Sequence, residues 1–156
     1  MEHAMLSDHD FLQVIQHAPL VAVDLLVRRD DDALLLGLRN NQPARGSWFV
    51  PGGRIRKNET MEDAFARLTR AELGQSVPFA ATTFRGVYTH KYDTNYKEAP
   101  GIDTHCVCLA YELPWLPDMA SLPKEQHAEY AWWTPAAAAQ SDRVHMHTRA
   151  YFDLYA

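Results

Sequence analysis

The chain has 156 residues, and 47% of them are hydrophobic, enough for one sizeable core, so we predict a single domain over residues 1–156. Its 20 acidic residues outnumber 15 Lys and Arg and give a net charge of -5, which argues against general binding of nucleic acid or anionic membranes. An anionic ligand would need a local basic cluster. No apolar run approaches the roughly 20 residues that cross a bilayer, and we expect a cytoplasmic protein.

The first third of the chain predicts a helix followed by short strands. Residues 7–10, Ser-Asp-His-Asp, are typical of a helix cap ahead of an apolar, helically spaced segment. Apolar runs bounded by turn-forming residues predict strands at 19–27, 34–38 and 48–50, with a hairpin turn at 28–32 and a glycine turn at 51–53.

A second helix and further strands are predicted in the rest of the chain. Thr60 and Gly74 are a typical helix start and stop, and the apolar residues between Met61 and Leu68 fall on one face. Strands are predicted at 84–92, 104–113 and 130–134, with two short helices after them. Because helices and strands interleave without regular βαβ alternation, we expect the α/β class, with a mixed β-sheet between helical layers.

Two cysteines, Cys106 and Cys108, lie in the second of these strands. Alternation along a strand would direct both side chains to one face. We expect two small buried side chains without a disulfide between them.

A glycine-rich turn, a basic loop and a carboxylate-bearing helix follow one another from Gly52 to Gly74. Glu59 lies six residues after Gly53, and Arg67 lies eight residues after Glu59. This spacing resembles the Nudix box, a loop–helix–loop that holds a divalent cation against a nucleoside diphosphate linked to another group. The resemblance implies the Nudix fold, an α/β/α sandwich with a mixed β-sheet between α-helices.

The helix departs from the usual box at two positions. The box normally carries an Arg-Glu pair and then a Glu-Glu pair, but here Leu68 follows Arg67 and Ala71 precedes Glu72. One carboxylate with a backbone carbonyl suits a single ion, and such a helix offers no base of its own. We therefore expect one Mg2+ ion, for which Mn2+ can substitute.

The departures and the flanking sequence resemble the GDP-mannose mannosyl hydrolase branch of the Nudix family. The similar segments are residues 36–46, 48–54, 67–74, 125–127 and 144–152. The resemblance implies a homodimer that acts on a nucleotide sugar, GDP-mannose or also GDP-glucose. Water would attack the anomeric carbon with inversion and release GDP and free sugar.

The resemblance also assigns the metal ligands and the base. A backbone carbonyl of Gly53, or of its neighbour Gly52, would bind the metal together with Glu72 and Gln126. His127 would be the general base, because neutral imidazole can accept a proton near neutral pH. The base would thus lie in a loop rather than on the helix.

Two arginines, Arg39 and Arg54, flank the glycine turn and are the predicted diphosphate contacts and catalytic cations, since guanidinium groups match phosphate oxygens in a bidentate manner. The resemblance implies a structural role for Arg67 instead, with a salt bridge to Glu59 or to the loop rather than a contact with substrate. Asp24 interrupts an apolar strand, where it binds a sugar hydroxyl, pairs with Arg39 or makes a buried structural pair.

Five other positions bear on the predicted site. Cys106 stands where the family has a tyrosine near the leaving group. Tyr92 or His90 would then supply that contact, and His90 is predicted to bind substrate. His145 and His147 are predicted to cap or pack the last helix rather than to bind metal.

Two other functions stay open. A conventional Nudix pyrophosphohydrolase would cleave a P–O bond of ADP-ribose or of another nucleoside diphosphate derivative and release a nucleoside monophosphate. A non-catalytic Nudix module would bind a nucleotide sugar without turnover, since the box is depleted.

Overall fold

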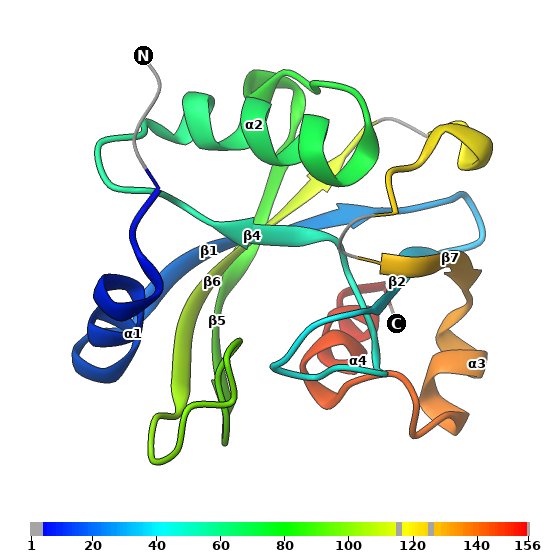
Figure 1. Cartoon of the computed structure of the whole chain (residues 1–156). Coiled ribbons are helices and arrows are strands. Elements are labelled where there is room, and N and C mark those ends of the chain that lie inside the picture. Colours follow the sequence, from blue (N-terminus) through cyan, green and yellow to red (C-terminus); the bar gives the residue numbers. More distant parts are fainter. Residues whose placement is uncertain (1–4, 115–116, 125–126, 156) are drawn as a thin grey trace.

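The computed structural model describes residues 5–114, 117–124 and 127–155. They form strands in two sheets with helices on both sides (Figure 1). The elements are α1 (Asp8–His17), β1 (Leu20–Val27), β2 (Leu34–Arg39), β3 (Trp48–Phe49), β4 (Gly52–Arg54), α2 (Met61–Leu73), β5 (Thr83–Tyr92), β6 (Thr104–Leu113), β7 (His127–Trp133), α3 (Pro135–Gln140), α4 (Met146–Phe152) and 3-10 turns at Phe79–Ala81, Met119–Ser121 and Asp153–Tyr155. None of the described helices is long and apolar enough to cross a membrane.

The strands divide into two sheets rather than the one mixed sheet expected. One sheet has the order β4-β1-β6-β5, with β1 parallel to β6, and the other has the order β3-β2-β7. The predicted turn at 28–32 forms, with the Arg29 N–H donating to the Ala33 carbonyl at 2.9 Å. Beyond the isolated Arg28–Leu34 bridge, however, β1 and β2 enter different sheets, so they do not continue as a hairpin.

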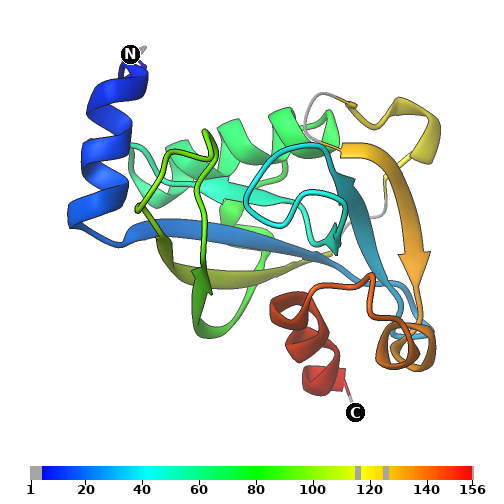
Figure 2. The same ribbon diagram turned by 60° about the horizontal axis from the view of Figure 1, so that its bottom comes forward.

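Strand β1 is buried on both of its faces. Val23, Leu25 and Val27 belong to a core that α2 closes, whereas Leu26 belongs to a second core that α4 closes. Figures 1 and 2 show α2 and α4 on opposite sides of the strands. Cover on both faces explains the nearly continuous apolar sequence of β1. The alternation of the strand places Asp24 on the same side as Leu26, towards α4.

Gly52 and Gly53 lie in β4, so their predicted placement in a turn is wrong. They pair with Asp24 and Val23 of β1. A Cβ atom on Gly52 would lie 2.3 Å from the Val23 carbonyl oxygen, and one on Gly53 would lie 2.6 Å from Leu68 Cδ2 of α2. The Val23 backbone therefore leaves no room for a side chain on Gly52, whereas a side chain on Gly53 would require Leu68 to shift.

Helix α2 begins and ends as predicted. Thr60 and Asp63 form a capping box at its start, and Gly74 ends it with φ of 80°. The predicted salt bridge of Arg67 is confirmed, with Nε 2.7 Å from Glu59 Oε2. Arg67 also donates to the Arg54 carbonyl at 2.9 Å, so the pair fastens the loop after β4 to the helix.

Glu59→Gln is expected to lower the free energy of unfolding by about 2 kcal/mol at neutral pH, because it removes a charge-assisted hydrogen-bonded pair. The hydrogen bond from Arg67 lowers the pKa of Glu59 to about 2. A lowered folded-state pKa contributes stability above the unfolded value near 4.5, and that stability is lost as the pH falls towards 2. Urea unfolding at pH 7 and pH 3 should therefore show a smaller difference between variant and wild type at pH 3. Glu62→Gln, an exposed position on the same helix, is the control, and an equal loss there would contradict the assignment.

Candidate functional site

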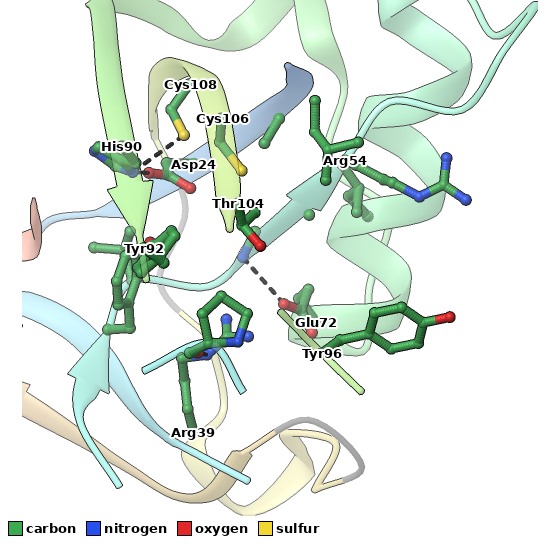
Figure 3. A pocket seen from close by; sticks show the side chains of 18 of the residues that line it. Asp24, Arg39, Arg54, Glu72, His90, Tyr92, Tyr96, Thr104, Cys106 and Cys108 are labelled. Carbon is green, nitrogen blue, oxygen red and sulfur yellow. Dashed lines mark hydrogen bonds and ion pairs between the residues drawn. The ribbon is translucent and has the colours of Figure 1, made fainter. Parts of the chain in front are cut away.

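A cavity of about 420 Å³ lies where the four-stranded sheet meets α1, α2 and the end of β2. Most of the predicted site residues line it, and Figure 3 shows several of them converging from different elements. Those that line it are Asp24, Arg39, Gly53, Arg54, Glu72 and His90. His127 is not among the described residues that line the cavity, and Gln126 lies outside the described part of the chain.

Glu72 is held at the wall of the cavity with 5% of its surface exposed. Its Oε1 atom accepts a hydrogen bond from the Gly52 N–H at 3.0 Å and lies 3.7 Å from His127 Nε2. Thus the box carboxylate that remains in α2 contacts β4 on one side and the first residue of β7 on the other.

His127 lies in a strand, not in the predicted loop, because it begins β7. Its ring is 1% exposed and packs so close to Gly37 that a Cβ atom there would lie 2.4 Å from the ring. Among the described residues, Nδ1 has no hydrogen-bond partner. The structure therefore brings His127 to Glu72 but not to the cavity surface.

The two predicted phosphate-binding arginines both line the cavity. The Arg39 Nε atom donates to the Pro43 carbonyl at 3.0 Å, and its guanidinium group lies 5.8 Å from the Phe49 ring centroid. The Arg54 guanidinium lies 4.3 Å from the centroid of the Phe11 ring, and burial lowers its pKa. The two cations reach the same cavity from separate sheets, β2 and β4.

Asp24 is buried, and the Tyr151 hydroxyl of α4 donates a short hydrogen bond to its Oδ2 atom. Of the roles predicted for Asp24, a buried structural pair is present, with Tyr151 in place of Arg39 as its partner. Burial raises the pKa of Asp24 to about 7, although the hydrogen bond from Tyr151 opposes that shift. The carboxyl is therefore poised to exchange a proton near neutral pH.

His90 faces Asp24 and Cys108 across the sheet. Its Nδ1 atom lies 3.1 Å from Cys108 Sγ and 3.9 Å from Asp24 Oδ2 (Figure 3). Burial lowers the pKa of His90 to about 4, so its ring is neutral at physiological pH. The ring stacks on His147 at a centroid distance of 4.3 Å.

The C-terminal histidines act as predicted. His145 precedes α4, and its Nδ1 atom accepts a hydrogen bond from the His147 N–H at 3.1 Å, which caps the helix. His147 Nε2 lies 3.1 Å from the Lys91 carbonyl oxygen. The His147 ring stacks on His90 and the His145 ring contacts Tyr92, so both rings join the start of α4 to β5.

Several cavity residues were not predicted as site residues. Phe11 of α1 and Tyr96 of the loop after β5 contact each other at 5.1 Å between ring centroids and form an aromatic wall. Cys106 is half-buried rather than buried and lines the cavity with Cys108. The shared face of the two cysteines was visible in the sequence, but the contact between α1 and the loop was not.

The donor atoms at the cavity fit two different kinds of metal ion. Glu72 and the backbone of Gly53 offer oxygen ligands, which suit Mg2+. A second set of possible ligands combines different donor atoms. Within the described residues, the side chains with ligand atoms close enough together to share an ion are those of Asp24, His90 and Cys108.

Comparison with known proteins gives a consistent result. The family model described as "NUDIX domain" matches residues 18–155. A glycan biosynthesis protein of Haloferax volcanii, "Low-salt glycan biosynthesis protein Agl8", is 35% identical over 149 residues, 95% of this chain and 89% of that protein. An ADP-ribose pyrophosphatase of Methanocaldococcus jannaschii is 39% identical over 56 residues, 36% of this chain and 32% of that protein.

The arrangement of the chain is also similar to that of solved structures. The crystal structure of a MutT NUDIX hydrolase from Burkholderia pseudomallei superimposes with a TM-score of 0.69 at 24% sequence identity, covering 90% of this chain and all of the other. At this identity the likeness concerns the fold, and it confirms the predicted one.

Proposed function

The chain belongs to the Nudix family of hydrolases, and on that premise we propose that it hydrolyses a nucleotide sugar, with GDP-mannose as the leading substrate and GDP-glucose as the second. The name of the Haloferax relative, which refers to glycan biosynthesis, supports a sugar-linked substrate. The resemblance of the depleted box and of its flanking segments to the GDP-mannose mannosyl hydrolases supports the choice of GDP-mannose.

The observation that carries the proposal is the convergence of Arg39, Arg54 and Glu72 on one cavity. Two fixed guanidinium groups in a chain of net charge -5 supply the local positive charge that a diphosphate needs. The aromatic wall of Phe11 and Tyr96 beside Arg54 offers ring surface against which a nucleobase could pack.

Nudix hydrolases generally use divalent metal ions such as Mg2+. Here Glu72 and a backbone carbonyl of Gly53, or of its neighbour Gly52, would hold the ion, together with Gln126. When bound, it would offset the negative charge that builds up on the departing diphosphate. The buried, hydrogen-bonded position of Glu72 supports this role, because its carboxylate is already oriented by the Gly52 N–H.

The remaining roles follow from chemistry and position. Arg39 and Arg54 hold the diphosphate and stabilise it as a leaving group. Asp24 and His90, next to each other on the cavity wall, bind sugar hydroxyls. His127 removes a proton from the water that attacks the anomeric carbon, and the sugar leaves inverted with GDP as the other product.

For His127 this proposal requires access to the water, and its ring is 1% exposed. Glu72 lies 3.7 Å from its Nε2 atom, on the side where the cavity begins. The imidazole can therefore act only if substrate or metal binding opens this contact, or if it acts by holding Glu72. These two roles predict a different dependence of the His127→Ala rate on the Mg2+ concentration.

Hydrolysis in 18O-labelled water identifies the bond that breaks. Attack at carbon is expected to place the label in the released sugar and to leave GDP unlabelled, with GDP and mannose as products of GDP-mannose. Mass spectrometry of both products, over a panel of nucleotide sugars, makes the measurement. Label in a phosphate oxygen together with a nucleoside monophosphate would refute the proposal.

Such a phosphate label would favour a conventional pyrophosphohydrolase, which the partial similarity to an ADP-ribose pyrophosphatase also suggests. Absence of metal-dependent turnover on every substrate, with retained binding, would favour a non-catalytic module. A homodimer in a cytoplasmic location, with no nucleic-acid or membrane partner, remains part of the proposal.

A further inference from the structure

We propose that Asp24, His90 and Cys108 form a second cation site in the wall of the cavity, one that binds a zinc-type transition metal ion. Their ligand atoms all lie within 4.8 Å of one another. His90 Nδ1 is 3.1 Å from Cys108 Sγ and 3.9 Å from Asp24 Oδ2, and Figure 3 shows the three side chains directed towards one another.

The spacing of the three ligand atoms suits a tetrahedral ion. Zinc binds carboxylate oxygen, imidazole nitrogen and thiolate sulfur at about 2.0–2.3 Å, so two ligands of a tetrahedral site stand roughly 3.3–3.6 Å apart. The two observed separations, 3.1 and 3.9 Å, lie on either side of that range. The ligand atoms of Asp24 and Cys108 also lie within 4.8 Å of each other, so all three atoms are close enough to share one ion.

The chemistry of the ligands selects the class of metal. Mg2+ and Ca2+ are bound by oxygen, and a thiolate contributes nothing to them. A mixed oxygen, nitrogen and sulfur set favours Zn2+ and the softer first-row ions. The site therefore differs in kind from the oxygen ligands of Glu72 and Gly53 on the neighbouring part of the wall.

The scaffold holds the three ligands rigidly. Asp24, Cys108 and His90 come from β1, β6 and β5, which are adjacent strands of one sheet. Tyr151 donates a hydrogen bond to Asp24, and His147 stacks on the ring of His90, so each of these two ligands has an outer contact that fixes its orientation. Such support is typical of protein metal sites.

Three protein ligands leave one tetrahedral position open. All three residues line the cavity, as does Cys106, the next residue along the same face of β6. In the proposed site, a ligand in the cavity would occupy the fourth position. The inference does not depend on the Mg2+ site, because Glu72 is not one of the three ligands, but it gives Asp24 and His90 a role other than binding sugar hydroxyls, so metal binding is tested without substrate.

Cobalt is the probe that tests the site. Metal-free, reduced protein titrated with Co2+ is expected to develop a thiolate-to-cobalt charge-transfer band and the ligand-field bands of a four-coordinate ion, saturating at one ion per chain, and Zn2+ should displace it. Cys108→Ser should remove the charge-transfer band. Asp24→Asn and His90→Gln should keep that band but weaken Co2+ binding by on the order of 100-fold.

Two control variants locate the site. His105→Gln alters the opposite face of β6, and Glu72→Gln alters the oxygen ligands of the Mg2+ site; both should bind Co2+ as wild type does. Circular dichroism and thermal unfolding check that each variant is folded. If Cys108→Ser does not fold, weaker Co2+ binding by the Asp24 and His90 variants is the test of the site. Absence of a charge-transfer band in the wild type would overturn the proposal. So would a band that survives in Cys108→Ser, or equal loss of binding in Glu72→Gln.

Discussion

Glu72→Gln is expected to reduce turnover by at least ~100-fold, because the change removes the only box carboxylate at the cavity and with it the charge that holds the divalent ion. Glutamine has nearly the same shape, and its side-chain oxygen can still accept the Gly52 N–H, so the fold should be preserved. Steady-state kinetics over a range of Mg2+ concentrations, with thermal unfolding as a check of the fold, make the measurement.

Glu62→Gln on the exposed side of the same helix is the matched control and should keep wild-type kinetics. Near-normal turnover of Glu72→Gln at saturating Mg2+ would show that the metal is held by other groups. The 18O experiment identifies the bond that breaks, whereas the Glu72 variant tests which group binds the metal. Either result can therefore contradict its own proposal without affecting the other.

His127→Ala is expected to reduce the rate about 100- to 10,000-fold, the usual contribution of a positioned general base. The two roles open to the imidazole predict different dependence on Mg2+. If His127 accepts the proton, the loss persists at saturating Mg2+. If it acts only by holding Glu72 through the 3.7 Å contact, raising Mg2+ should restore most of the rate.

Two further variants make this test robust, since removing a fully buried ring also leaves a cavity. His127→Gln retains much of the volume without the imidazole. Gly37→Ala keeps the imidazole but displaces it, because the added Cβ would lie 2.4 Å from the ring. A wild-type rate in His127→Gln would exclude His127 as the base.

The sequence was most informative where the relevant contacts are local. Thr60, Gly74 and the Glu59–Arg67 pair all act within or beside one helix, so the capping residues predicted the boundaries of α2 and the resemblance to the Nudix box predicted its salt bridge. The approach of Glu72 to the cavity followed from the same spacing, because a helix repeats its faces at fixed intervals.

The sequence was misleading where strand pairing decides the local structure. Gly52 and Gly53 were expected to form a turn, yet both lie in β4, which pairs with β1 so closely that a Cβ atom on Gly52 would lie 2.3 Å from the Val23 carbonyl oxygen. His127 was expected in a loop, yet pairing of β7 with β2 places it opposite Arg39 and buries it. Neither pairing leaves a local signal, since both join segments distant in sequence.

The sequence by itself determined the family, the α/β class, helix α2 with its single remaining box carboxylate, and the two arginines that a diphosphate would require. Only the tertiary structure decided that Asp24, His90 and Cys108 meet, because they lie on three strands whose order in the sheet differs from their order in the chain. Likewise, Tyr151 reaches Asp24 across 127 positions only because α4 packs on that face of β1. Contacts between residues a few positions apart can be predicted from their spacing in the sequence. Contacts between distant segments depend on how the sheets and helices pack around the two cores.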